Sequence, residues 1–329
     1  MLYDNHGRQI NYLRLAVTDR CNLRCFYCMP EEGIKYVPRK DLLSYEEMRR
    51  IVSLLASMGI EKIRITGGEP FLRKDMMDFL AAINKLEGLK QIHITTNGTL
   101  TAPLIPDFKK VGIKSVNLSL DSLDKKRFFD ITRRDQFDTV METFHLLLKH
   151  NIKTKINAVV MEGRNTEDIT PMAALTKDYP VGVRFIEEMP FNGEGSNYPK
   201  LVWNHKKILA ELKQTFPDIQ KLEDPPFSTS LNYRVPGHQG TIGIIPAFSR
   251  TFCGTCNRIR ITPKGVLKTC LYDDGVFDLR GLLRAGATDK ELETAFLDAL
   301  NTRAKNGFEA EQNRQFGAPA SESMATIGG

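Results

Sequence analysis

Short runs of β-branched and aliphatic residues alternate with amphipathic stretches along the first two thirds of the chain. Strands are predicted over residues 13–18, 63–66, 92–95, 115–120, 153–160 and 183–186. Helices are predicted over residues 44–58, 74–86, 102–111, 125–130, 137–149 and 166–178. This alternation predicts about six βα units with parallel strands and right-handed crossovers. Since a closed TIM barrel has eight units, the expected fold class is α/β, an open partial (βα)6 TIM-like barrel.

Local signals set the limits of these elements. Ser44 and Glu47 form the pattern of a capping box, and Gly59 is a natural stop for the helix that follows. The βα alternation ends in a proline-rich polar stretch over residues 216–230, which predicts a boundary. We therefore expect two domains, residues 1–225 and residues 226–329.

The second domain has a weaker pattern. Short strands are predicted over residues 241–245, 258–262 and 265–268, and a helix over residues 289–301. From Gln312 onward the residues are small and polar, which predicts a mobile tail that includes Gly328 and Gly329.

Composition excludes several classes of protein. The 329 residues are 41% hydrophobic, which is ordinary for a globular chain and excludes a disordered or fibrous one. We find no run of about 18 apolar residues, the length that a membrane helix needs, and no apolar segment of a secretory signal. The expected location is the cytoplasm. The net charge of +6 is a weak indication of anionic partners.

The cysteines are more informative than the charge. All six fall into two triplets, Cys21/Cys25/Cys28 and Cys253/Cys256/Cys270. A cytoplasmic chain of this length has no need of a disulfide framework. Two tight triplets therefore predict two metal sites.

The first triplet has the spacing C-x3-C-x2-C and follows the first predicted strand, at the barrel face that carries catalytic groups. Cubane iron–sulfur clusters ordinarily take four thiolates, so three leave one iron open for reaction. The second triplet, C-x2-C-x13-C, offers the same opening. The alternatives are a zinc knuckle with a distant ligand and a zinc ribbon, which requires a second pair of cysteines.

The first triplet, with Tyr27 before its last cysteine, resembles the signature of the radical S-adenosylmethionine (SAM) enzymes. Gly67-Gly68-Glu69-Pro70 after the second strand is similar to the GGEP motif of that family. The resemblance implies a radical SAM type of partial barrel and a [4Fe–4S] cluster whose open iron binds SAM. It also implies reductive cleavage of SAM to a 5′-deoxyadenosyl radical. The SAM-binding positions that it implies are Tyr27, Gly68, Ser119 and Met189.

Within the family, both triplets together, the Cys-Asn-Arg-Ile-Arg run and the Gly-Gly pair resemble the branch that cyclises GTP in molybdenum-cofactor biosynthesis. The resemblance implies a second [4Fe–4S] cluster in the C-terminal segment, hydrogen abstraction at the ribose C3′ and closure of a bond to guanine C8. The implied GTP-binding positions are Arg14, Arg64, Thr95, Lys155, Arg258, Ile259 and Arg260. The implied catalytic positions are Arg184, Gly328 and Gly329.

The basic residues of the strands favour an anionic ligand independently of the resemblance. A charge inside an apolar strand is costly unless it is paired or faces a ligand. Arg14, Arg64, Lys155 and Arg184 each lie in a predicted strand, which favours a polar lumen for a polyanion. The alternative, that each is paired with a barrel carboxylate, stays open.

The resemblance also implies partners: a flavodoxin or ferredoxin as reductant, and cyclic pyranopterin monophosphate synthase as the next enzyme. It leaves a homodimer open, and we expect no nucleic acid and no membrane as a partner. Two other functions remain as alternatives. One is a radical SAM peptide-modifying enzyme with an auxiliary cluster, and the other is a zinc-bearing nucleic-acid-binding protein.

Overall fold

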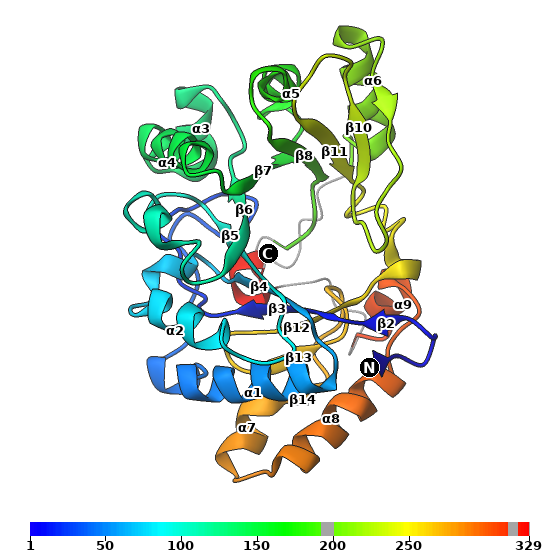
Figure 1. Ribbon diagram of the computed structural model, residues 1–329. Coiled ribbons are helices and arrows are strands. Elements are labelled where there is room, and N and C mark those ends of the chain that lie inside the picture. The colour runs from blue at the N-terminus through cyan, green and yellow to red at the C-terminus, as the bar shows by residue number, and fades with distance from the viewer. Residues whose placement is uncertain (192–200, 315–321, 329) are drawn as a thin grey trace.

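Strands from most of the chain form one curved sheet, and helices cover its outer face (Figure 1). The structure, a computed structural model, describes residues 1–191, 201–314 and 322–328. Its strands are β1 (Leu2–Tyr3), β2 (Gln9–Ile10), β3 (Tyr12–Ala16), β4 (Lys62–Thr66), β5 (Gln91–Thr96), β6 (Ile113–Ser119), β7 (Lys153–Val160), β8 (Gly182–Glu187), β9 (Gln220–Lys221), β10 (Leu231–Arg234), β11 (Thr241–Ile245), β12 (Arg258–Ile261), β13 (Val266–Lys268) and β14 (Phe277–Asp278). Its α-helices are α1 (Tyr45–Met58), α2 (Met76–Ile83), α3 (Lys125–Thr132), α4 (Phe137–Lys149), α5 (Ile169–Asp178), α6 (His205–Thr215), α7 (Leu279–Arg284), α8 (Asp289–Asn301), α9 (Gly307–Gln312) and α10 (Met324–Ile327).

The centre of the sheet is the expected open barrel. In the described residues the strand order is β14-β13-β12-β3-β4-β5-β6-β7-β8-β11-β10-β9. Strands β3 to β8 are neighbours in chain order, and every adjacent pair is parallel, which confirms the six predicted strands of the βα units. Strand β12 pairs in parallel with β3, and β11 with β8, so the last third of the chain extends the barrel at both edges. The two-domain division at residue 225 stays a prediction.

Side chains alternate along each strand between the apolar core under the helices and the lumen of the barrel. In β7, Ile156 and Ala158 are buried in a hydrophobic cluster with Phe144 of α4. The residues between them, Lys155 and Asn157, face the inside of the barrel, where both line a cavity. Because successive side chains of a strand point to opposite faces, each strand presents an apolar face to the helices and a polar face to the lumen.

The helix signals of the sequence hold in some places and fail in others. Ser44 and Glu47 form the predicted capping box of α1, which ends at Gly59 in the left-handed conformation, as predicted. The helix expected over 102–111 is instead a 3₁₀ segment, Ala102–Asp107. Pro106 lies inside it and has no N–H to donate, so an α-helix cannot continue there.

The segment expected to be a mobile tail is folded where the structure describes it. Helix α10 is capped by Ser323, and Ile327 is buried with Phe191, Tyr272 and Ala310. A Cβ on Gly328 would lie 3.0 Å from the side chains of Ala16 and Thr66, a close fit that composition alone does not reveal. In the described part of the chain, we find no helix with the length and apolar character needed to span a membrane.

Candidate functional site

The first cysteine triplet lies at the carboxyl end of the barrel strands. Cys21, Cys25 and Cys28, in the loop after β3, line one pocket of about 180 Å³. The SAM-binding positions implied by the sequence line this same pocket: Tyr27, Gly68, Ser119 and Met189. The structure therefore brings together residues from the cysteine loop and from the ends of β4, β6 and β8.

These thiols are buried, and this bears on what they can hold. Burial raises the pKa of Cys21 to about 12 and raises the pKa values of Cys25 and Cys28 as well. A thiolate is the metal ligand, and in this pocket it needs a positive partner to form. The iron of a cluster supplies such a charge, so the donor set fits the group that the sequence implies.

The turn after β4 braces the cysteine loop. A Cβ on Gly68 would lie 2.2 Å from the carbonyl oxygen of Arg20, so only glycine fits. Glu69 is fully buried and accepts hydrogen bonds from Thr96 Oγ1 at 2.9 Å and from Asn97 N at 2.8 Å. Burial raises the pKa of this carboxyl to about 7. Glu69 thus anchors the turn against the end of β5.

Sequence reasoning missed Asp121 in this pocket. The Tyr27 hydroxyl donates to Asp121 Oδ2 at 2.8 Å, and Val159 N donates to Oδ1 at 2.8 Å. Burial raises the pKa of Asp121 to about 6. The sequence does carry a signal for Asp121. It lies two residues after Ser119, the last residue of β6, and both side chains line the pocket.

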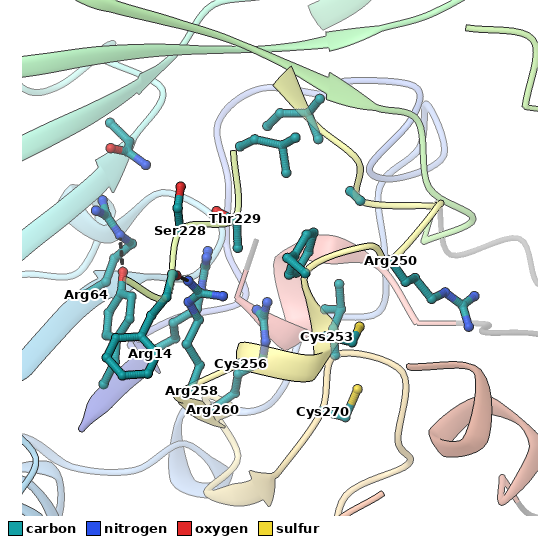
Figure 2. Close-up of a pocket in the computed structure, with 18 of the residues that line it drawn as sticks. Arg14, Arg64, Ser228, Thr229, Arg250, Cys253, Cys256, Arg258, Arg260 and Cys270 are labelled. Atoms are coloured by element: carbon teal, nitrogen blue, oxygen red, sulfur yellow. Dashed lines mark hydrogen bonds between the residues drawn. The ribbon is translucent and has the colours of Figure 1, made fainter. Parts of the chain in front are cut away.

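The second triplet lines a larger cavity of about 350 Å³ inside the barrel, shown in Figure 2. Cys253, Cys256 and Cys270 lie at one end of it. Eight cationic side chains also line this cavity: Arg14, Lys62, Arg64, Lys155, Arg184, Arg250, Arg258 and Arg260. One of them, Arg250, is paired with Glu311 at 2.7 Å. No described aspartate or glutamate lines it, which disfavours the alternative of pairing with barrel carboxylates.

The cations of this cavity affect one another strongly. Burial and the neighbouring Arg260 lower the pKa of Arg14 well below its usual range, and burial with Arg184 lowers the pKa of Lys155 to about 7. Among the described residues, the buried atoms Arg14 Nε and Asn157 Oδ1 have no hydrogen-bond partner. Unpartnered polar atoms beside crowded positive charges favour a polyanionic ligand with both donors and acceptors.

The cysteines of the second triplet differ in their surroundings. Arg303 Nη2 donates to Cys256 Sγ at 3.3 Å. Burial alone would raise the pKa of Cys256, but Arg258 and Arg303 lower it overall. Burial raises the pKa of Cys270 to about 11. The two arginines thus stabilise the thiolate of Cys256, whereas burial disfavours the thiolates of Cys253 and Cys270.

Neither triplet has the geometry of a single metal ion. Within residues 1–191, 201–314 and 322–328, we find no three thiol, imidazole or carboxylate groups gathered closely enough to hold one ion. Zinc–sulfur bonds of about 2.3 Å bring ligand sulfurs close together, whereas each thiolate of a cubane cluster binds a different iron. The described cysteines are therefore not arranged as the ligands of one zinc ion.

The pocket of the first triplet and the cavity of the second adjoin each other. They share Asn157, Ile186, Met189 and Met324 as lining residues. A ligand in the cavity therefore lies next to whatever occupies the pocket, with these side chains at the junction.

Of the described residues predicted to bind GTP or to act in catalysis, three do not line the cavity. Thr95 lines the pocket of the first triplet, although Arg64 Nη1 donates to its Oγ1 at 3.4 Å. Ile259 packs in the outer core, since it alternates with Arg258 and Arg260 along β12, and its side chain does not line the cavity; its predicted role stays a prediction. Gly328 is buried, and its carbonyl oxygen accepts from Arg260 Nη1 at 2.8 Å.

Gly329 lies outside the described residues. Its predicted role, like the roles of the other site residues, stays a prediction.

Two lining residues were missed although the sequence carries their signal. Tyr12 and Lys62 lie two positions before Arg14 and Arg64, and the period of a strand places them on the same face. The Tyr12 hydroxyl accepts from Arg64 Nε at 2.7 Å. Burial acts to raise the pKa of Tyr12, but Arg64, Arg14 and Lys62 lower it to about 7.

Known proteins resemble this chain in both halves. Residues 15–176 match the radical SAM superfamily, and residues 181–309 match the family described as Molybdenum Cofactor Synthesis C. The "GTP 3′,8-cyclase" of Desulforamulus reducens is 42% identical over 304 residues, 91% of this chain and 93% of the relative. The "GTP 3′,8-cyclase, mitochondrial" of Arabidopsis thaliana is 41% identical over 293 residues, 89% of this chain and 75% of the relative.

The human "Molybdenum cofactor biosynthesis protein 1" is 45% identical over 292 residues, 88% of this chain. This chain spans about half the length of that relative, 46% of it. Among solved structures, Streptococcus suis SuiB bound to S-adenosylmethionine has a TM-score of 0.62 at 16% identity, over 94% of this chain and 68% of that one. At that identity the likeness shows the fold alone.

A partial barrel with a cysteine triplet after its first strand defines a radical SAM protein. The length and identity of the matches go further. The chain belongs to the GTP 3′,8-cyclase family of the radical SAM superfamily.

Proposed function

We propose that this protein converts GTP to (8S)-3′,8-cyclo-7,8-dihydroguanosine 5′-triphosphate, the first step of molybdenum-cofactor biosynthesis. One observation carries the proposal. A cavity with eight cationic side chains and three cysteines adjoins a second pocket with three more cysteines. Such a site accommodates a nucleoside triphosphate next to a reactive cofactor. Relatives that are 41–42% identical to this chain over the aligned residues carry the name of this activity.

The cofactors are SAM and two [4Fe–4S] clusters. Cys21, Cys25 and Cys28 would hold the first cluster, and the second triplet would hold the other. When bound, the first cluster and SAM would supply the radical chemistry that hydrogen abstraction at the ribose C3′ requires.

The residues of the chain bind and orient the nucleotide. Arginine forks at Arg14, Arg64 and Arg258 suit phosphate oxygens, which they contact in pairs. Burial and the charge of Arg184 lower the pKa of Lys155 to about 7, and a phosphate beside its Nζ raises that pKa, so that the lysine holds its proton. Ile186 and Met189, at the junction of the two hollows, exclude water from the reacting atoms.

The partners follow from the chemistry. The reaction needs a one-electron donor, for which we propose a reduced flavodoxin or ferredoxin in the cytoplasm. The triphosphate product is a substrate for cyclic pyranopterin monophosphate synthase.

The test is anaerobic. Reconstituted protein is incubated with SAM and a strong reductant, and 5′-deoxyadenosine is quantified with GTP, with ATP and without nucleotide. We expect 5′-deoxyadenosine to increase with GTP only, because ATP keeps the triphosphate but changes the base. Formation that ignores the nucleotide would favour the peptide-modifying alternative. A protein with full iron and sulfide that forms none would overturn the assignment of the first triplet.

A further inference from the structure

The cationic cavity has a neighbour at the amino ends of the barrel strands. A hollow of about 200 Å³, here called the vestibule, is lined by Asn11, Tyr12, Glu61, Lys62, Lys90, Gln91, Pro226, Phe227, Asn257 and Arg258. Five of these residues, Tyr12, Lys62, Pro226, Phe227 and Arg258, also line the cavity. The vestibule and the cavity therefore adjoin each other across these shared residues. The pocket of the first triplet lies at the opposite, carboxyl end of the strands.

The partition between the two hollows is a loop that crosses the open side of the barrel. Residues 222–230 connect β9 to β10 near one end of the strand order, whereas β12 lies toward the other end. Arg258 Nη2, on β12, donates to the Phe227 carbonyl oxygen at 2.7 Å and so joins the two sides. Figure 2 shows Ser228 and Thr229 of the same loop beside Arg14 and Arg258.

This joint is under local backbone strain. Phe227 has φ of +62°, in the left-handed region that strains a non-glycine residue. Its carbonyl is a neutral acceptor, and a phosphate oxygen forms the stronger, charge-assisted bond with a guanidinium. An arriving phosphate can thus replace Phe227 as the partner of Arg258.

Charge at the vestibule favours the approach of an anion. Its charged lining residues are the cations Lys62, Lys90 and Arg258 and one carboxylate, Glu61. Lys90 stands at the outer rim with 66% of its side chain exposed, and its ammonium lies 2.6 Å from Glu61. Beyond the vestibule the cavity is lined by cations without a described carboxylate. The field therefore draws a polyanion inward.

The other end of the barrel is covered by the chain itself. Ser323 Oγ donates to the Cys28 carbonyl oxygen at 2.6 Å, and Met324 N donates to that of Phe191 at 3.1 Å. Gly328 is so close to Ala16 and Thr66 that a Cβ would lie 3.0 Å from both side chains. A nucleotide bound for the cavity meets this segment and the pocket of the first triplet at the carboxyl end; among the described residues, the loop of Phe227 lies between vestibule and cavity at the amino end.

We propose that the vestibule is the port through which the anionic nucleotide enters the cavity, and that the Phe227–Arg258 hydrogen bond is its latch. This inference rests on the proposed function, because it takes a nucleoside triphosphate as the ligand. The rim cations attract the triphosphate, Arg258 exchanges the Phe227 carbonyl for phosphate, and the loop moves aside.

The first experiment changes the rim charge. Lys90→Glu is compared with Lys110→Glu, because Lys110 is also an exposed lysine paired with one carboxylate, Asp107, but lies elsewhere. Binding of a fluorescent N-methylanthraniloyl GTP is followed by stopped flow in reconstituted, SAM-loaded protein under anaerobic conditions. We expect the association rate of Lys90→Glu to fall about three- to tenfold at low salt, to recover at high salt, and the dissociation rate to change little. Lys110→Glu should match the unaltered protein.

The second experiment changes the latch. Phe227→Gly keeps the carbonyl acceptor, removes the strain at positive φ and removes the ring between the hollows. We expect both association and dissociation to become faster, with little change in Kd. Unchanged rates in Phe227→Gly, or equal association rates in the two lysine variants, would overturn the port. If the proposed function were wrong, the result would be different: the unaltered protein would form no GTP-dependent 5′-deoxyadenosine.

Discussion

Lys155 shows how single residues carry the chemistry of this cavity. Burial, and next the charge of Arg184, lower its pKa to about 7 in the folded protein, against an ordinary value of 10.5. A lowered pKa means that the fold disfavours the charged form of the lysine. Between pH 7 and 10.5 the unfolded chain holds a proton that the fold releases, so this residue makes the free protein more stable as the pH rises through that window.

Nucleotide binding should reverse this effect. A triphosphate beside Lys155 raises its pKa, so we expect GTP binding at pH 8 to take up protons and the affinity to fall as the pH rises from 7 to 9. Calorimetry in buffers of different ionisation enthalpy measures the uptake. Lys155→Met should reduce the uptake and weaken binding about tenfold at pH 7. Equal proton uptake in the variant would contradict this role.

At the scale of residues, the sequence predicts side chains on regular strands better than those on loops. Arg14 and Arg64 were predicted from their place in apolar strands, and Tyr12 and Lys62 follow from the same two-residue period. Phe227 carries no such signal, because its contact with Arg258 joins loop and strand through tertiary structure.

At the scale of elements, the turn after β4 connects two parts of the pocket of the first triplet. Its backbone donates to the cysteine loop: Gly68 N to the Thr18 carbonyl oxygen at 2.8 Å, and Glu69 N to that of Arg20 at 2.8 Å. The turn and the loop therefore cannot move independently. Regular helices and strands were predicted from their periodicity, whereas this contact depends on the parallel register of β3 and β4.

We expect Gly68→Ala to displace the cysteine loop. Its Cβ would lie 2.2 Å from the Arg20 carbonyl oxygen, and relief requires a backbone shift that costs roughly 1–3 kcal/mol. The bound iron and the SAM affinity should both fall, the latter at least about fivefold, as measured by iron analysis and equilibrium binding. Gly254→Ala, in the second cysteine loop, is the control because its Cβ would meet nothing within 4 Å. Equal losses in both variants would argue against this account.

At the scale of the whole molecule, the segment from Glu322 to Gly328 joins regions that are distant in sequence. Lys268 on β13 is completely buried, and its ammonium lies 2.6 Å from Glu322. Ser323 contacts the first cysteine loop, and Gly328 contacts Arg260 on β12. One short segment thus touches the surroundings of both triplets, which no local pattern of small polar residues predicts.

Glu322→Gln should loosen this segment. It leaves the Lys268 charge buried without its carboxylate, at a cost of about 3 kcal/mol, the lower end of the range for buried pairs because Glu322 is 30% exposed. We expect a lower Tm and faster hydrogen exchange over residues 322–328. Asp107→Asn, which breaks the exposed pair with Lys110, should change the Tm little. A Tm of Glu322→Gln that equals the control would show that the ion pair contributes nothing.

The pairing of β12 with β3 has a consequence for synthesis on the ribosome. Asn257 beside β12 bonds to Asn11 beside β3, 246 residues earlier in the chain. At about 5–20 residues per second, the nascent chain keeps that edge of β3 unpaired for roughly 12–50 s. Open edges invite wrong pairing and aggregation, so chaperones have their longest opportunity here. The strand that ends this exposure, β12, lies between Cys256 and Cys270 in the chain, so the second triplet and the edge partner of β3 are synthesised together.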